Sequence, residues 1–472
     1  MLTLADVIEG LSGTRPVDVM QTIRHVVIDS REAGPGDLFV AFVGENVDGH
    51  QFVADAFRRG AIAALIEQDL PSIDAATFDL RSDRSARSIG PAQLPVLLRV
   101  DKTLMALQEL AKWWRARFDH LGVIGITGSV GKSSTKELIA AVLQRDFTIL
   151  KSEGNLNNEI GLPLTLLQLE ARHELAVLEM GTYGAGEITR LAELARPIIG
   201  VVTLVGPVHL ERMKSIDAIA EAKSELVQAL PPNGVAILNY DDSRVRSMAA
   251  KTRARVLTYG LDPAADLWAD EIVGEGLEGI HFTLHYRREA LHVQVPLLGR
   301  HSVHTSLRAA AVGLAEEMSW DHILDGLQDR RAQLRLVAVP GPKDSMILDD
   351  TYNASPASMI AALNLLSELS GRKIAVLGDM LELGEYEDEG HRMVGLRAMD
   401  VADVLVTVGS LGRVMAEEAL LNGLPHDRVK TCETNDEALT YLDQIIQPKD
   451  VILVKGSRGL HMEDIVTALG RG

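Results

Sequence analysis

Short apolar runs alternate with amphipathic segments along most of the chain, which is the pattern of an α/β protein. The first hundred residues contain β-like runs at 25–30 and 37–44 and a helical pattern at 52–65. Residues 68–95 are polar and interrupted by Pro, Gly and Ser, so we expect a loop and linker there. These periods predict a small α/β domain in the first part of the chain.

From Asp101 onward, a helical segment leads into alternating apolar strands and helices, which predicts a parallel sheet covered by helices. A β-rich stretch at 280–299 and a helix from about Ser306 follow, and a second α/β series begins near Arg331. The strands predicted for the two series lie at 123–128, 175–181, 198–205, 235–242 and 256–260, then at 345–352, 373–380, 404–410 and 451–457. We therefore expect an α/β protein of three domains, at residues 1–100, 101–330 and 331–472, the last of them Rossmann-like.

Composition narrows the class of protein. Hydrophobic residues make up 46% of the 472 and charged residues 24%, as in globular proteins. The balance of 47 basic against 66 acidic residues gives a net charge of −19, which argues against nucleic-acid binding. The single cysteine, Cys432, excludes an internal disulfide framework and suits a reducing compartment. Without a signal-like N-terminus or an apolar run of about 18 residues, we expect a cytoplasmic monomer with no membrane span.

The segment TGSVGKSS stands between the apolar run VIGI and a helical pattern, the usual position of a phosphate-binding loop. Its glycines allow backbone N–H groups to turn toward anionic oxygens, and the helix start adds attraction for negative charge. Ile126 replaces the first glycine of the strict consensus, so an ordinary Gly/Ser turn is the alternative. The residues predicted to contact nucleotide are Thr127, Gly128, Ser129, Val130, Gly131, Lys132, Ser133 and Ser134.

Three further side chains are candidates for chemistry. Glu179 ends one apolar strand and His209 follows another, although each also has an ordinary structural explanation. Lys223 falls on the apolar stripe of a helical segment at 215–230. A lysine there must snorkel to solvent, form an ion pair or be chemically altered. If its pKa is lowered, its neutral amine can react.

Taken in order, these motifs resemble those of the Mur ligases, the ATP-dependent amide-forming enzymes of bacterial cell-wall precursor synthesis. Near the N-terminus the similar segment is DSREAGPGDLFVAFVGENVDGHQF, and in the centre they are TGSVGKSSTKE, EGNLNNEIGLP, LEMGTYGAGEI, VGPVHLE and AEAKSEL. In the last part they are LDDTYNASPASM, VLGDMLELGEYEDEGH and VLVKGSRG. These last three resemble the members that add D-alanyl-D-alanine to UDP-N-acetylmuramoyl-tripeptide.

The resemblance implies a role for each candidate. Lys132 and the loop amides would hold the phosphates of ATP, and Ser133 with Glu179 would bind one Mg²⁺ ion. His209 and a carbamylated Lys223 would serve a second Mg²⁺, which makes Lys132, His209 and Lys223 the expected catalytic residues. The residues matching UDP-muramoyl contacts are Ser30, Arg31, Asn155, Asn157 and Asn158, and those matching contacts to the nucleotide are His301, Arg335, Asp350 and Tyr352.

The chain departs from the family pattern before its last central helix. In GRHSVHT, Ser302 and Thr305 stand where the family has two asparagines on the adenine side of the ATP site. An amide offers both a donor and an acceptor, whereas a hydroxyl is shorter and reaches less far. Three alternatives therefore stay open: a related ligase such as a folylpolyglutamate type with another acceptor, a nucleotide-binding paralogue that does not ligate, and a P-loop kinase.

Overall fold

A computed structural model describes residues 1–16, 19–44, 47–81, 94–329 and 336–470. Its fold is α/β, with three sheets among these residues, as the sequence predicts. The chain separates into two compact units. The first comprises Met1–Gly125, Phe147–Gly181 and Glu187–Ile198, and the second comprises Ile126–Asp146, Thr182–Gly186 and Ile199–Gly472.

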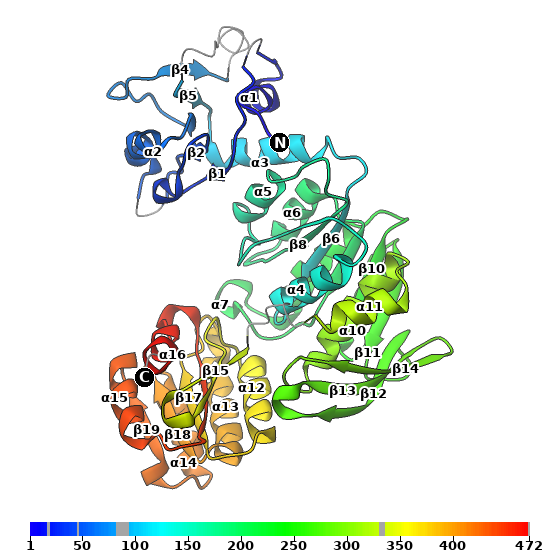
Figure 1. The fold of residues 1–472 in the computed structure, drawn as a ribbon, viewed down its shortest axis with the longest axis vertical. Helices are drawn as coiled ribbons and strands as arrows, with labels where there is room; N and C mark the ends of the chain where they lie inside the picture. The colour runs from blue at the N-terminus through cyan, green and yellow to red at the C-terminus, as the bar shows by residue number, and fades with distance from the viewer. Residues whose placement is uncertain (17–18, 45–46, 82–93, 330–335, 471–472) are drawn as a thin grey trace. The chain divides into compact units, whose positions relative to one another are not determined.

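The N-terminal sheet is parallel, with the strand order β1-β2-β3-β5-β4 (Figure 1). Its apolar side chains form one cluster with Val53 and Ala56 of the helix α2. Helix α1 begins with a capping box between Thr3 and Asp6, which satisfies backbone N–H groups at the helix start. The elements are α1 (Leu4–Ser12), β1 (Val26–Val27), β2 (Leu38–Val40), α2 (Val53–Arg59), β3 (Ala63–Ile66), β4 (Ala76–Asp79) and β5 (Val96–Arg99).

The predicted linker at 68–95 is wrong in part, because β4 lies inside it and pairs in parallel with β5. This strand is short and lies at the edge of the sheet, and only Phe78 among its residues is buried. An edge strand with one buried side chain carries little apolar periodicity, so the pattern gave no signal. Residues 82–93 of the predicted linker lie outside the described residues.

The central sheet has the order β14-β13-β12-β11-β10-β9-β6-β8-β7, with the β-rich stretch forming antiparallel strands at one end. Strands β6, β8, β9 and β10 are buried throughout, as expected for strands covered on both faces. The helices are α3 (Thr103–Arg115), α4 (Lys132–Leu143), α5 (Gly161–Leu166), α6 (Glu187–Ala195), α7 (Leu210–Met213), α8 (Ile216–Gln228), α9 (Ser243–Ser247), α10 (Ser302–Ala315) and α11 (Trp320–Leu327). The strands are β6 (Gly122–Thr127), β7 (Ile149–Lys151), β8 (Leu175–Glu179), β9 (Ile199–Val202), β10 (Val235–Asn239), β11 (Arg255–Gly260), β12 (Leu267–Gly274), β13 (Ile280–Tyr286) and β14 (Glu289–Val295).

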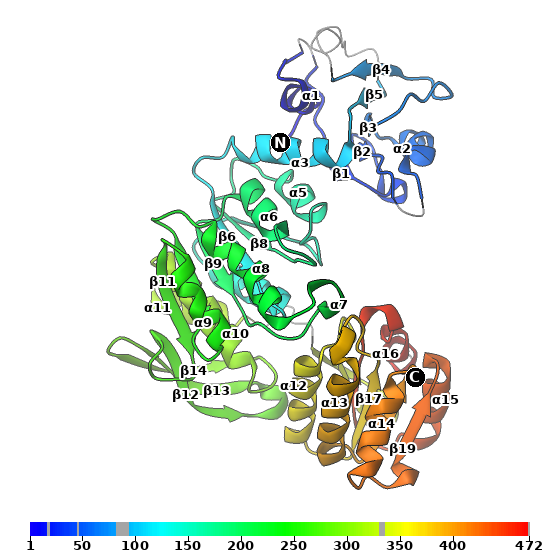
Figure 2. The same ribbon diagram turned by 180° about the vertical axis from the view of Figure 1, so that it is seen from behind.

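In the second unit, helices cover both faces of the central strands. Figure 1 shows α4, α10 and α11 over one face, and Figure 2 shows α8 and α9 over the other. The first group packs closely, because a Cβ at Gly326 would lie 2.4 Å from the Cα of Val142. Helix α10 begins at Ser302, earlier than the predicted start near Ser306. This close packing fixes α4 and α10, whose first turns carry candidate site residues.

The C-terminal sheet has the order β15-β16-β20-β17-β18-β19, parallel except for β15. Alternate residues along each strand face opposite sides: Leu377 packs in the cluster with α12, α13 and α14, and Val376 in the cluster with α15 and α16. This is the predicted Rossmann-like arrangement. The elements are β15 (Val337–Pro340), β16 (Met346–Asp349), α12 (Pro356–Glu368), β17 (Lys373–Gly378), α13 (Glu387–Val401), β18 (Val404–Val408), α14 (Gly412–Leu421), β19 (Val429–Cys432), α15 (Asn435–Ile445), β20 (Val451–Lys455) and α16 (Glu463–Leu469).

Candidate active site

The segment TGSVGKSS forms the turn from β6 into α4. Gly128 has φ 146°, and a Cβ there would lie 1.8 Å from Thr203 Oγ1, so this position requires glycine. Gly131 has φ 82° and is the left-handed N-cap of α4, which starts directly at Lys132. A tight glycine turn that opens onto a helix N-terminus suits the oxygens of a phosphate group. The local geometry therefore fits a bound polyphosphate.

Side chains and backbone groups after β9 hold this loop in place. Thr203 Oγ1 donates a hydrogen bond of 2.7 Å to the Val130 carbonyl oxygen. Ser129 Oγ donates to the Gly206 carbonyl oxygen at 3.0 Å and accepts from the Gly206 N–H at 2.9 Å. Lys132 Nζ folds back and donates to the Gly128 carbonyl oxygen at 2.8 Å. The loop is thus pre-organised, which limits the entropy lost when an anion binds.

Lys223 is 3% exposed on α8, so its predicted place on the apolar face of a helix is confirmed. Burial lowers the pKa of Lys223 well below its usual value, and the positive charge of Lys132 lowers it further. In the described part of the chain no carboxylate forms an ion pair with it. A neutral lysine amine beside the phosphate loop is a nucleophile for small electrophiles.

His209 lies close enough to this pair for both ammonium groups to affect it. It precedes α7 with φ 55°, and its Nδ1 lies 2.5 Å from Glu382 Oε2. Burial lowers the pKa of His209; Glu382 opposes this effect, and Lys132 and Lys223 add to it. The structure thus brings Lys132, His209 and Lys223 together. Glu382 was not predicted, because a sequence does not show which residue 173 positions away meets a histidine.

Glu179 is 1% exposed at the end of β8, in the first unit. Asn157 Nδ2 donates to its Oε1 at 2.8 Å, and the Glu179 N–H donates to Ser152 Oγ at 3.3 Å. Asn158 Oδ1 instead accepts from the backbone N–H groups that lead into α5, the turn role named above as its alternative. Asn155 is exposed. Of the three asparagines, only Asn157 contacts a predicted metal ligand.

Ser30 and Arg31 lie in a 3-10 turn, Ser30–Glu32, of the N-terminal domain. Ser30 Oγ is buried and donates to Asp55 Oδ2 at 3.1 Å. Arg31 is exposed and forms an ion pair of 2.5 Å with Asp29, whose pKa it lowers to about 2. Arg31 is therefore held in one orientation by a neighbour while its face remains open to solvent.

The C-terminal candidates lie around the end of β16. Asp350 pairs with the buried Lys455 at 2.7 Å, and Lys455 Nζ also donates to the Asn353 carbonyl oxygen at 2.8 Å. The Arg458 guanidinium carbon lies 5.6 Å from the centre of the Tyr352 ring. Lys455 and Arg458 belong to the VLVKGSRG motif, but the sequence did not assign them to the site. Arg335 lies outside the described residues.

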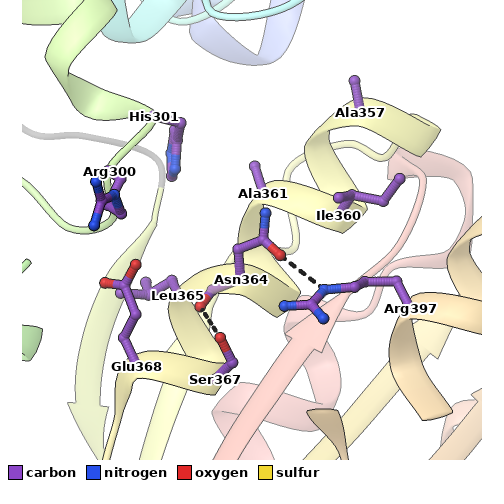
Figure 3. Close-up of a pocket in the computed structure, with 10 residues that line it drawn as sticks. All are labelled: Arg300, His301, Ala357, Ile360, Ala361, Asn364, Leu365, Ser367, Glu368 and Arg397. Atoms are coloured by element: carbon purple, nitrogen blue, oxygen red, sulfur yellow. Dashed lines mark hydrogen bonds between the residues drawn. The ribbon is translucent and has the colours of Figure 1, made fainter. Parts of the chain in front are cut away.

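A cavity of about 360 Å³ adjoins the start of α10 and the outer side of α12 (Figure 3). Arg300 and His301 face α12 across it, and Arg397 Nε donates to Asn364 Oδ1 at 2.8 Å on its far side. The remaining lining residues are Ala357, Ile360, Ala361, Leu365, Ser367 and Glu368. His301 is the only predicted site residue in this lining, so the cavity is separate from the phosphate loop.

Within the described ranges, no three His, Cys, Asp or Glu side chains are grouped as ready-made metal ligands. The same residues include no helix long and apolar enough to cross a membrane.

Three family models match the chain in succession: a Mur ligase family catalytic domain over residues 22–114, a Mur ligase middle domain over 126–313, and a Mur ligase glutamate ligase domain over 331–458. Together with a full-length relative at 35% identity, these matches show that the chain belongs to the Mur ligase family.

Within this family, the chain is similar to proteins of one type. It is 35% identical to the UDP-N-acetylmuramoyl-tripeptide–D-alanyl-D-alanine ligase of Bacillus subtilis, over 99% of this chain and 98% of the relative. It is similar to a crystal structure of MurF from Acinetobacter baumannii, with 31% identity, a TM-score of 0.84 and coverage of 99% and 98%. It is also similar to MurF from Thermotoga maritima in complex with ADP, with 26% identity, a TM-score of 0.78 and coverage of 95% and 97%.

Proposed function

We propose that this chain joins D-alanyl-D-alanine to UDP-N-acetylmuramoyl-tripeptide and converts ATP to ADP and phosphate. The observation that carries the proposal is the buried Lys223 beside Lys132 of the phosphate loop, with His209 at the same place. A nucleotide-binding protein needs the loop alone, whereas a ligase must also stabilise two anions that react with each other. The relatives named for this reaction cover nearly the whole chain, which supports the same conclusion.

The chemistry follows from the weakness of a carboxylate as an electrophile. The terminal carboxylate of the tripeptide attacks the γ-phosphorus of ATP, forming an acyl phosphate and releasing ADP. The amine of D-alanyl-D-alanine then attacks the acyl carbon, loses a proton and expels phosphate. Lys132 and the N-terminus of α4 reduce the repulsion between the carboxylate and the phosphates in the first step. Because an acyl phosphate hydrolyses readily, the site must exclude water until the amine arrives.

We propose that Ser133 and Glu179 hold one Mg²⁺ ion and that His209 and Lys223 serve a second. A neutral amine can add to CO₂ and lose a proton, which turns Lys223 into a carbamate with anionic oxygens. Such oxygens are ligands that Mg²⁺ prefers, and the metal supplies charge neutralisation at the transferring phosphoryl group. Burial and the lowered pKa of Lys223 support this role, because both favour the neutral amine.

The remaining assignments are part of the same proposal. Ser30, Arg31, Asn155 and Asn157, with Asn158, contact the UDP-muramoyl substrate. His301, Asp350 and Tyr352, together with Arg335, close over the nucleotide. Domains at 1–100, 101–330 and 331–472 bind the UDP-substrate, ATP and the incoming dipeptide in turn. We expect a monomer in the cytoplasm.

The direct experiment measures phosphate release under saturating Mg-ATP with each acceptor pair. We expect release only when both UDP-N-acetylmuramoyl-tripeptide and D-alanyl-D-alanine are present. Release without the dipeptide, or none with both substrates, would refute the ligase. ADP binding without phosphate release would instead favour the non-ligating paralogue.

A separate experiment tests Lys223. Protein equilibrated with ¹³C-bicarbonate should show a carbamate carbon signal, and Lys223→Ala should lose both this signal and most activity. Lys251→Ala is a matched control, because Lys251 lies on the surface and pairs with Glu221 near the same helix. Near-normal turnover of Lys223→Ala would show that the carbamate is not needed.

A further inference from the structure

Arg308, on the second turn of α10, is a buried cation that neither the motifs nor the proposed mechanism assign. Its side chain belongs to a residue that is 4% exposed. Its Nη2 donates to Thr305 Oγ1 at 2.7 Å, and its Nη1 makes a long contact of 3.4 Å with the Tyr259 hydroxyl. Its Nε has no hydrogen-bond partner, and no described carboxylate forms an ion pair with it. A buried guanidinium without a counter-charge is costly, so a missing anion is implied.

The position of Arg308 indicates where that anion lies. A Cβ built on Gly131 would lie 3.4 Å from Arg308 Nη2, so the guanidinium stands beside the phosphate loop. Gly131 is the N-cap of α4, a helix of 12 residues. The partial positive charge of this helix end and the full charge of Arg308 therefore act on the same space. An anion bound at the loop can supply the charge that Arg308 lacks.

The two hydroxyl residues that replace the family's asparagines now have distinct roles. Ser302 Oγ donates to the Leu298 carbonyl oxygen at 2.7 Å, a bond within the start of α10. Thr305 Oγ1 accepts from Arg308, so Thr305 orients the guanidinium. A guanidinium has only donors, which match the acceptor-only oxygens of phosphate and cannot pair with the amino group of adenine. The chemistry favours a phosphate over the base.

We propose that Arg308 binds a phosphate group of the nucleotide and that Thr305 positions it for this contact. This inference rests on the proposed function only in taking the ligand to be a nucleotide. It adds a charged phosphate contact on α10, at a site where the family motif leads one to expect amides.

The test compares Arg308→Met with the unchanged protein. We expect the affinity for ADP, measured by calorimetry, to fall at least tenfold, and the affinity for adenosine, measured by ligand-observed NMR, to stay within twofold. Arg308→Lys should give an intermediate loss, since it keeps the charge but not the fork of donors. Arg115→Met is the control: Arg115 is also buried, but it donates to the carbonyl oxygens of Ala195, Phe118 and Leu121.

Unchanged ADP affinity in folded Arg308→Met would overturn the inference, and so would an equal loss for adenosine. If that variant does not fold, Thr305→Val provides the same comparison, because it removes only the hydroxyl that orients Arg308. It should weaken ADP binding severalfold without changing adenosine binding, and unchanged ADP binding would again refute the idea. Loss of ADP affinity together with absent phosphate release would uphold this inference while rejecting the ligase.

Discussion

Replacing Gly128 by alanine should disrupt the phosphate loop through two separable effects. The backbone at φ 146° is a conformation that L residues rarely adopt, which costs about 1–3 kcal/mol. The new Cβ would also lie 1.8 Å from Thr203 Oγ1, and relief of such overpacking costs about 1–3 kcal/mol. Together they predict a loss of about 2–6 kcal/mol, shared between lower stability and a distorted loop.

The assay is urea unfolding combined with ADP binding. Gly423→Ala is a matched control, because Gly423 has φ 115° and nothing lies within 4 Å of an added Cβ. The control should show only the backbone part of the loss and normal ADP affinity. In a Thr203→Ala background, Gly128→Ala should cost less, since the clashing hydroxyl is gone. Equal costs at Gly128 and Gly423, with ADP affinity unchanged at both, would refute the steric argument.

Three further changes test other parts of the fold. Burial raises the pKa of Asp379, so the folded state holds that proton more tightly than the unfolded state; stability should fall as pH rises from the ordinary carboxyl range through the raised pKa, and urea titrations of Asp379→Asn should lack this slope. Trp114→Phe removes the 3.1 Å bond from Nε1 to the Leu169 carbonyl oxygen and should cost about 1–3 kcal/mol in unfolding free energy; a loss below about 0.5 kcal/mol would contradict this. Lys455→Met leaves Asp350 without its ion-pair partner and should lower the melting temperature, with a loss of about 3 kcal/mol at the upper end; an unchanged melting temperature would count against the pair.

The strands that could be predicted from the sequence are those buried on both faces. Segments such as Leu175–Glu179 and Ile374–Leu377 are continuous apolar runs, and burial dictates their composition. The edge strands Ala76–Asp79, Val337–Pro340 and Val429–Cys432 were missed, because most of their side chains are partly or fully exposed. Solvent imposes no apolar pattern on such strands, so their pairing depends on the neighbouring strand alone.

The candidate site divides in the same way. The loop at Gly128 and the buried Lys223 were visible in the sequence, because a glycine turn and an apolar helix stripe are local patterns. The contacts made by Thr203, Glu382 and Arg308 were not, because each depends on segments far apart in the chain. Local patterns identify the residues that handle phosphate, but only the fold shows which groups hold them in position.

The central claim is that the phosphoryl group passes to a carboxylate before the amide bond forms. The most direct measurement uses UDP-N-acetylmuramoyl-tripeptide with ¹⁸O in its terminal carboxylate, together with Mg-ATP and D-alanyl-D-alanine. The mechanism predicts that each released phosphate carries one ¹⁸O atom, because the acyl C–O bond breaks when the amine attacks. Phosphate without ¹⁸O, released while the amide product accumulates, would contradict the acyl phosphate.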